Sequence, residues 1–147
     1  MKFLALLLLS SITVIDLSWQ TDFEKAKQTA HEKHHLILLN FSGSDWCGPC
    51  IRLHKEIFDS DGFKKVADEQ LELVNADFPR LRKNQLSKEQ QQQNDKLADR
   101  YNAQGNFPAT ILLDADGKVI KEWDGYPSHG ITVFIDELNT AIHAANQ

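Results

Sequence analysis

The feature that most constrains this chain is a pair of cysteines, Cys47 and Cys50, set between an apolar run and a helical pattern. Residues 36–41 are almost entirely apolar, which indicates a short strand buried on both faces of a sheet. Beyond the cysteines, apolar side chains recur at helical spacing as far as about residue 58. Pro49 is compatible with this helix because it falls in the first turn, where its missing N–H is not needed. The chain is therefore expected to run from a buried strand through a tight loop into a helix.

That placement gives the cysteine pair a specific chemistry. A helix N-terminus favours a thiolate, and it commonly lowers the pKa of a cysteine thiol from ~8.5 to ~3.5–7.5. We therefore expect Cys47 to attack disulfides and Cys50, one helical turn later, to resolve the mixed disulfide. The alternatives are a static structural disulfide or half of a metal site. Only two cysteines are present, so a zinc site would need two further ligands, and we expect neither a metal nor an organic cofactor.

The rest of the chain predicts one α/β domain. With 41% hydrophobic and 25% charged residues, the 147-residue chain has the composition of a single globular domain. Thr21 and Glu24 have the spacing of a capping box, and so do Ser87 and Gln90, which marks the start of two helices. We expect helices at residues 21–34, 47–58, 60–70, 87–101 and 131–145, and strands at residues 36–41, 71–77, 109–113 and 118–123. These make a central mixed sheet of about four strands, flanked by helices.

The first eighteen residues differ from everything after them. Lys2 is followed by an apolar stretch that continues to Ile15 and is shorter than the roughly 20 residues that span a bilayer. This pattern predicts a secretory signal at residues 1–18, with residues 19–147 as the exported, periplasmic domain. An uncleaved membrane anchor is the competing interpretation, and a buried N-terminal strand or helix is a third.

Charge narrows the choice of partner. A net charge of -5 and a pI near 5.6 argue against nucleic acid, because phosphate binding needs a basic face. One basic cluster, Arg80, Arg82 and Lys83, lies in a long connection between predicted elements. It is most simply solvated surface, although a connection of this kind can also contact a partner.

Two motifs resemble the thioredoxin superfamily. Residues 46–50 read WCGPC, the thioredoxin active-site pentapeptide, and residues 107–110 read FPAT, similar to the cis-proline signature of that family. The resemblance covers about residues 20–145. It implies a thioredoxin fold with a cis peptide bond before Pro108. It also implies a substrate-binding surface around the cysteines, made by Trp46, Gly48, Pro49, Phe107 and Pro108.

Residues 41–47, 56–58 and 77–80 look like the exported thioredoxin-like proteins of bacteria, which are similar to the periplasmic domain of membrane electron-relay reductases. This resemblance implies a monomeric enzyme that reduces or isomerises protein disulfides with electrons from a membrane electron-relay reductase. The Gly-Pro pair between the cysteines is of the reducing type, since thioredoxin lies near ~-270 mV and a strong periplasmic oxidant near ~-120 mV. A disulfide-forming oxidant and a non-catalytic binding module remain the alternatives.

Two departures from cytoplasmic thioredoxin affect the site. There is one more residue between Phe41 and Trp46, and Asn40 stands where the family has a buried aspartate, which is thought to accept the proton of the resolving cysteine. Asparagine cannot accept that proton. We hypothesise that His54, one turn after Cys50, partly replaces the aspartate, since imidazole titrates near ~6.5. The alternative is a solvated surface histidine. Asp45 would oppose thiolate formation if its carboxylate lay close to Cys47.

Overall fold

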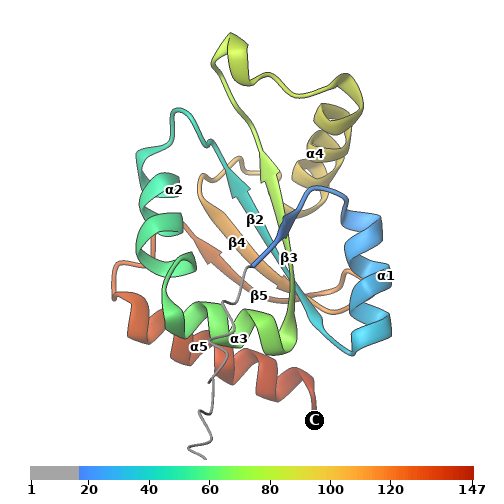
Figure 1. Cartoon of the computed structure of the whole chain (residues 1–147), viewed down its shortest axis with the longest axis vertical. Helices are drawn as coiled ribbons and strands as arrows, with labels where there is room; N and C mark the ends of the chain where they lie inside the picture. Colours follow the sequence, from blue (N-terminus) through green and yellow to red (C-terminus); the bar gives the residue numbers. More distant parts are fainter. Residues whose placement is uncertain (1–16) are drawn as a thin grey trace, which may run out of the picture.

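The computed structural model describes residues 17–147, in which a mixed sheet forms a central layer with helices on both faces (Figure 1). The strands are β1 (Trp19–Gln20), β2 (Leu36–Ser42), β3 (Leu71–Asp77), β4 (Ala109–Leu113) and β5 (Val119–Asp124). The helices are α1 (Phe23–Lys33), α2 (Gly48–Leu53), the π-helix η1 (His54–Phe58), α3 (Asp61–Gln70), the 3-10 turn η2 (Arg82–Asn84), α4 (Lys88–Tyr101) and α5 (Ile131–Ala145).

The expected secretory signal at residues 1–18 lies outside the described residues, apart from Leu17 and Ser18. Within residues 17–147, every helix is too short or too polar to cross a bilayer.

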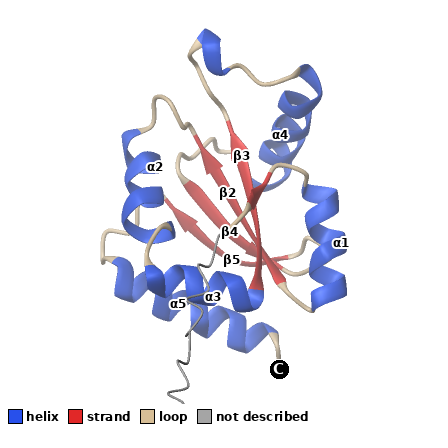
Figure 2. Cartoon of the chain, viewed as in Figure 1, coloured by secondary structure: helices blue, strands red, loops and turns tan. Residues whose placement is uncertain are grey.

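The sheet has five strands, in the order β1-β3-β2-β4-β5. β1, β3 and β2 run parallel to one another, while β4 is antiparallel to both β2 and β5 (Figure 2). The expectation of about four strands was low by one, because β1 contains only Trp19 and Gln20. A strand of two residues is too short to show alternation, so it forms only because the edge of β3 offers it partners.

The hydrophobic core lies on both sides of the sheet. In Figure 1, α1 and α4 cover one face, and α2, α3 and α5 cover the other. All seven residues of β2 are buried, as expected for the central strand, and their side chains alternate between the two faces. Leu38 packs toward α3 and α5, whereas Ile37 and Leu39 pack toward α1 and α4. α2, which follows β2 in the chain, is therefore connected to a strand that is packed on both faces.

The two predicted helix caps had different outcomes. Ser87 caps α4 as expected, because its hydroxyl accepts a hydrogen bond from the Gln90 amide (3.1 Å). The expected cap of α1 at Thr21 was wrong by one residue. Asp22 is the cap, since its carboxylate accepts from the Lys25 amide (3.0 Å) and also carries the negative charge that a helix N-terminus favours.

The single helix expected at residues 47–58 changes its winding partway along. α2 ends at Leu53 and continues into the π-helix η1, in which the Asp59 amide donates to the His54 carbonyl (2.9 Å). With this wider turn, the consecutive residues Ile57 and Phe58 are both buried.

Candidate active site

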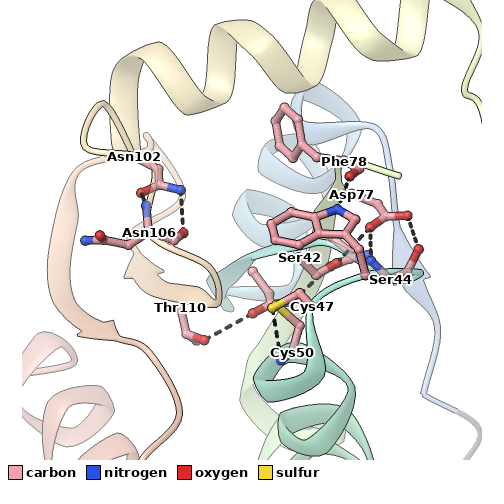
Figure 3. Close-up of a disulfide and its surroundings, with 12 residues drawn as sticks. Ser42, Ser44, Cys47, Cys50, Asp77, Phe78, Asn102, Asn106 and Thr110 are labelled. Atoms are coloured by element: carbon pink, nitrogen blue, oxygen red, sulfur yellow. Dashed lines mark hydrogen bonds between the residues drawn. A yellow bond between two sulfur atoms is a disulfide. The ribbon is translucent and has the colours of Figure 1, made fainter. Parts of the chain in front are cut away.

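The two cysteines lie where β2 leads into α2. Residues 43–46 form a tight turn after Ser42, closed by the Cys47 amide, which donates to the Gly43 carbonyl (2.8 Å). Cys47 is the N-cap of α2, and its sulfur accepts a hydrogen bond from the Cys50 amide (3.3 Å). The two sulfurs form a disulfide, and the two residues are only 4% and 1% exposed (Figure 3). The residue expected to attack therefore sits at a helix N-terminus, where backbone amides stabilise a thiolate.

Trp46, next to the disulfide, is held by its neighbours. Its indole N–H donates to the Phe78 carbonyl (2.7 Å), and its ring meets Phe107 edge-on at a centroid distance of 5.4 Å. The Arg80 guanidinium lies 3.6 Å from the centre of the indole. Gly43 is required beneath the ring, because a Cβ atom at that position would overlap the indole. Trp46 is thus half-buried and fixed beside the sulfurs.

The second predicted motif, residues 107–110, lies next to Trp46 through the contact made by Phe107. The Phe107–Pro108 peptide bond is cis, as the resemblance implies. The loop before it is shaped by Asn102, whose side chain donates to the Asn106 carbonyl and accepts from the Asn106 amide, both at 2.9 Å (Figure 3). Because Phe107 contacts Trp46, this loop lies at the same end of the sheet as the disulfide.

A chain of polar side chains crosses the centre of the sheet behind the cysteines. It joins, in order, Thr110, Asn40, Asn75, Ser42, Asp77 and Ser44. Asn40 is fully buried; its amide nitrogen donates to Asn75 Oδ1 (3.0 Å), and its oxygen accepts from the Thr110 hydroxyl (3.2 Å). The place of the buried carboxylate of thioredoxin is therefore taken by a pair of uncharged amides.

From the sequence, we singled out Asn40 but missed its partners. An isolated polar residue within an apolar strand carries no strong signal by itself. The register supplies one, however: Asn40 and Asn75 are both the fifth residue of their strands, and they face each other in the parallel pair. Thr110 faces Asn40 from the other side.

His54 is brought close to the resolving cysteine. Its backbone amide donates to the Cys50 carbonyl, and both residues line a pocket of about 330 Å³ together with Ser42 and Asn75. On its other side, the imidazole packs against Trp19 at a centroid distance of 5.2 Å. Burial lowers the pKa of His54 below its ordinary value, an effect only partly opposed by two carboxylates. The structure thus places His54 in a partly buried position and not on the open surface.

Asp45 is hydrogen-bonded to the loop that follows β3. Its carboxylate accepts the backbone amides of Arg80 and Leu81, both at 2.9 Å, and the side-chain amide of Asn84 (3.0 Å). The hydrogen bond from Arg80, followed by that from Asn84, lowers the pKa of Asp45. Asp45 therefore holds this loop and keeps its negative charge, and the expectation that a charge close to Cys47 would oppose thiolate formation stays a prediction.

Comparison with known proteins agrees with this geometry. The family model described as a thioredoxin-like domain matches residues 23–140. The disulfide bond reductase DsbH of Chlamydia pneumoniae is 33% identical over 131 residues, which span 89% of this chain and 76% of that protein. The thioredoxin-related protein DsbJ of the same organism is 30% identical over 102 residues, or 69% of this chain and 28% of DsbJ. A solved structure of a DsbH oxidoreductase superposes with a TM-score of 0.80 at 30% identity, covering 97% of this chain and 95% of that one.

The motif at the start of α2, the cis-proline loop beside it and these relatives lead to one conclusion. The chain belongs to the thioredoxin-like family of thiol–disulfide oxidoreductases, and its two cysteines, Cys47 and Cys50, are paired in a disulfide.

Proposed function

We propose that this protein reduces or isomerises disulfides in other proteins of the bacterial periplasm. The observation that carries the proposal is the Cys47–Cys50 disulfide at the start of α2, beside cis-Pro108, in a chain similar to a disulfide bond reductase. The Gly-Pro pair between the cysteines supports the reducing direction, since thioredoxin with the same pair lies near ~-270 mV.

Each cysteine has one role in the proposed reaction. In the reduced protein, the Cys47 thiolate attacks one sulfur of the substrate disulfide, and the other substrate sulfur leaves as a thiolate that takes up a proton. Cys50 then loses its proton and attacks the Cys47 sulfur, which releases the second substrate thiol. Two electrons pass to the substrate, and the Cys47–Cys50 disulfide remains. In isomerisation, the released substrate thiolate instead attacks another disulfide of the substrate. The thiolate displaced there attacks the mixed disulfide, which frees Cys47 and leaves the number of substrate disulfides unchanged.

The substrate is proposed to lie across the surface around the disulfide. Gly48 and Pro49 are exposed there, and Trp46 and Phe107 are half-buried beside them. Pro108 itself is buried and has no N–H to donate, so an extended substrate strand is proposed to pair with the backbone next to it, near the sulfurs.

His54 is proposed to accept the proton of Cys50. It shares the pocket with Cys50, and a neutral imidazole can take up a proton. Burial lowers the pKa of His54, which keeps the ring unprotonated but also makes it a weaker base, so the proposed role is a partial replacement of the aspartate. His54→Ala is then expected to slow resolution of the mixed disulfide and to change the pH profile of that step. His129→Ala, at an exposed position, is the matched control. An unchanged profile in His54→Ala would remove His54 from the mechanism.

Export and re-reduction complete the proposal. Residues 1–18 act as a secretory signal or an anchor, and a membrane electron-relay reductase returns two electrons to the monomeric protein after each turnover. Cell fractionation of a tagged full-length chain tests the location. In the same strain, loss of the relay reductase is expected to leave the cysteines oxidised.

The decisive experiment measures direction. We expect a reduction potential close to that of thioredoxin when the protein is equilibrated with glutathione, and disulfide reduction in insulin that is lost in Cys47→Ser. A potential above about -180 mV would instead favour the disulfide-forming oxidant. A binding module would keep its function in Cys47→Ser and would leave insulin intact. Cys50→Ser is expected to trap the mixed disulfide, which mass spectrometry detects as an added substrate mass.

A further inference from the structure

We propose that the loop at residues 79–85, here called the basic loop, selects protein disulfides whose attacked cysteine is flanked by acidic residues. The inference rests on the proposed function and names the substrate class of the same site. The loop carries the cations Arg80, Arg82 and Lys83, all exposed, and no acidic residue.

The basic loop has a defined shape. Asp45 accepts the amides of Arg80 and Leu81 and the side chain of Asn84 at 2.9–3.0 Å, which fixes one side of the loop. Gln85 closes the other side by donating to two loop carbonyls, at 3.2 and 3.4 Å. The turn η2 lies between these ties. The three cations therefore lie on a loop that is already ordered by hydrogen bonds, so binding a partner would not cost the free energy of ordering it.

The basic loop is joined directly to the reaction centre. The Arg80 guanidinium stacks 3.6 Å from the centre of the Trp46 ring, and Trp46 immediately precedes Cys47. The Trp46 indole also donates to the carbonyl of Phe78, just before the loop. In Figure 1, the loop rises from the end of β3 at the same end of the sheet as the start of α2. A polypeptide lying across the disulfide would thus pass close to these charges.

The charge of the basic loop is available to a partner. Among the described residues, none of the ion pairs involves Arg80, Arg82 or Lys83. Asp45, which is bonded to neutral donors of the loop, offsets one of these three cations, and the chain as a whole is acidic, with a net charge of -5. A local cluster of cations on such a chain attracts an acidic segment and repels a basic one. Leu81, 48% exposed, adds an apolar contact within the cluster.

The test uses two peptides, each closed by one disulfide and identical except for the two residues beside one cysteine. These are Glu in the acidic peptide and Lys in the basic peptide. Stopped-flow tryptophan fluorescence gives the rate at which the reduced protein reacts with each. Charges at the rim of a contact act mainly on association, so we expect the acidic peptide to react about tenfold faster at low salt. The preference is expected to disappear near ~1 M salt, where screening acts within ~3 Å.

Charge reversal identifies the source of the preference. The double variant R82E/K83E is expected to lose or invert it while reacting normally with the uncharged bis(2-hydroxyethyl) disulfide. The control K65E/K118E makes the same change in net charge at exposed positions on α3 and in the turn before β5, and it should keep the preference.

Four results overturn the inference. Equal rates with the two peptides, or a preference that survives in R82E/K83E, show that the basic loop does not select. An equal loss in the control shows that net charge alone decides. If no disulfide reacts with the wild-type protein, the proposed function fails, and this inference fails with it.

Discussion

Asn40→Asp tests whether the polar side chains behind the disulfide are shielded from water and whether they require an N–H donor at position 40. The substitution keeps the shape of the side chain but exchanges an N–H donor for an oxygen. Asn40 is fully buried, and its donor faces Asn75 Oδ1 at 3.0 Å, an atom that also lies 3.1 Å from the Ser42 hydroxyl. A protonated carboxyl can still donate to that oxygen, whereas an ionised one would oppose it. Burial and the lost hydrogen bond both raise the pKa of the new carboxyl.

The size of the effect follows from proton linkage. Leaving a buried polar group without its hydrogen bond lowers the free energy of unfolding by about 1–3 kcal/mol. A shift of one pKa unit corresponds to about 1.4 kcal/mol. With a raised pKa, the folded variant holds a proton that the unfolded chain has already lost above about pH 4. Its stability therefore falls as the pH rises through the next one to two units and then levels off. We expect Asn40→Asp to be nearly as stable as the wild type at pH 4 and about 1–3 kcal/mol less stable at pH 7.

Urea denaturation followed by tryptophan fluorescence between pH 4 and pH 8 measures this difference. Subtracting the wild-type curve at each pH cancels the groups that both proteins share. Asn139→Asp, at an exposed position in α5, is the matched control and should remain within about 0.5 kcal/mol of the wild type throughout. A flat difference for Asn40→Asp would refute the reasoning, because it would mean that water reaches position 40 or that Asn75 turns its amide to serve the carboxylate.

Three further predictions concern neighbouring groups. Trp19→Ala should raise the pKa of His54 toward its ordinary value, because it uncovers the imidazole; an NMR titration that stays unchanged would contradict this. In the wild type, the lowered pKa of His54 makes the free energy of unfolding fall as the pH drops from about 6.5 through the pKa of the folded state. Trp19→Ala should therefore lose less stability than the wild type between pH 8 and mildly acidic pH. Gly43→Ala is expected to reduce the free energy of unfolding by about 1–3 kcal/mol and to alter the near-UV circular dichroism, since the methyl group overlaps Trp46. Glu72→Gln should lower the urea midpoint by the equivalent of about 1–2 kcal/mol at pH 7, because the buried carboxylate lies within 3.1 Å of nitrogen atoms on three side chains; an unchanged midpoint would show that those contacts are not stabilising.

Local patterns predicted most of the elements. The strands at residues 71–77 and 109–113 and the helix at residues 131–145 have the expected bounds, since each is an apolar pattern ended by turn or capping residues. The features that were missed lack such a pattern. β1 is only two residues long. The π-helix at residues 54–58 buries the consecutive residues Ile57 and Phe58 in the core, and this packing is not visible in the spacing of apolar residues.

The active site divides in the same way. Cys47 and Cys50 were identified because their reactivity depends on neighbours in the chain: the strand before them and the helix that begins with them. The partners of Asn40 and the orientation of Asp45 could not be inferred in this way. Asn75 and the loop that binds Asp45 lie about 35 positions away along the chain, and Thr110 lies 70 positions from Asn40. Only the pairing of β2 with β3 and β4 and the return of the chain after β3 bring them close.

By itself, then, the sequence determined the order of the elements and the chemistry of the dithiol, because hydrophobic periodicity and helix initiation act over a few residues. Only the tertiary structure decided what surrounds that dithiol. The uncharged amide pair behind it, the histidine covered by Trp19 and the basic loop held by Asp45 all arise where distant segments meet. Hydrogen bonds and burial depend on distances in space, and those are established only when the sheet has assembled.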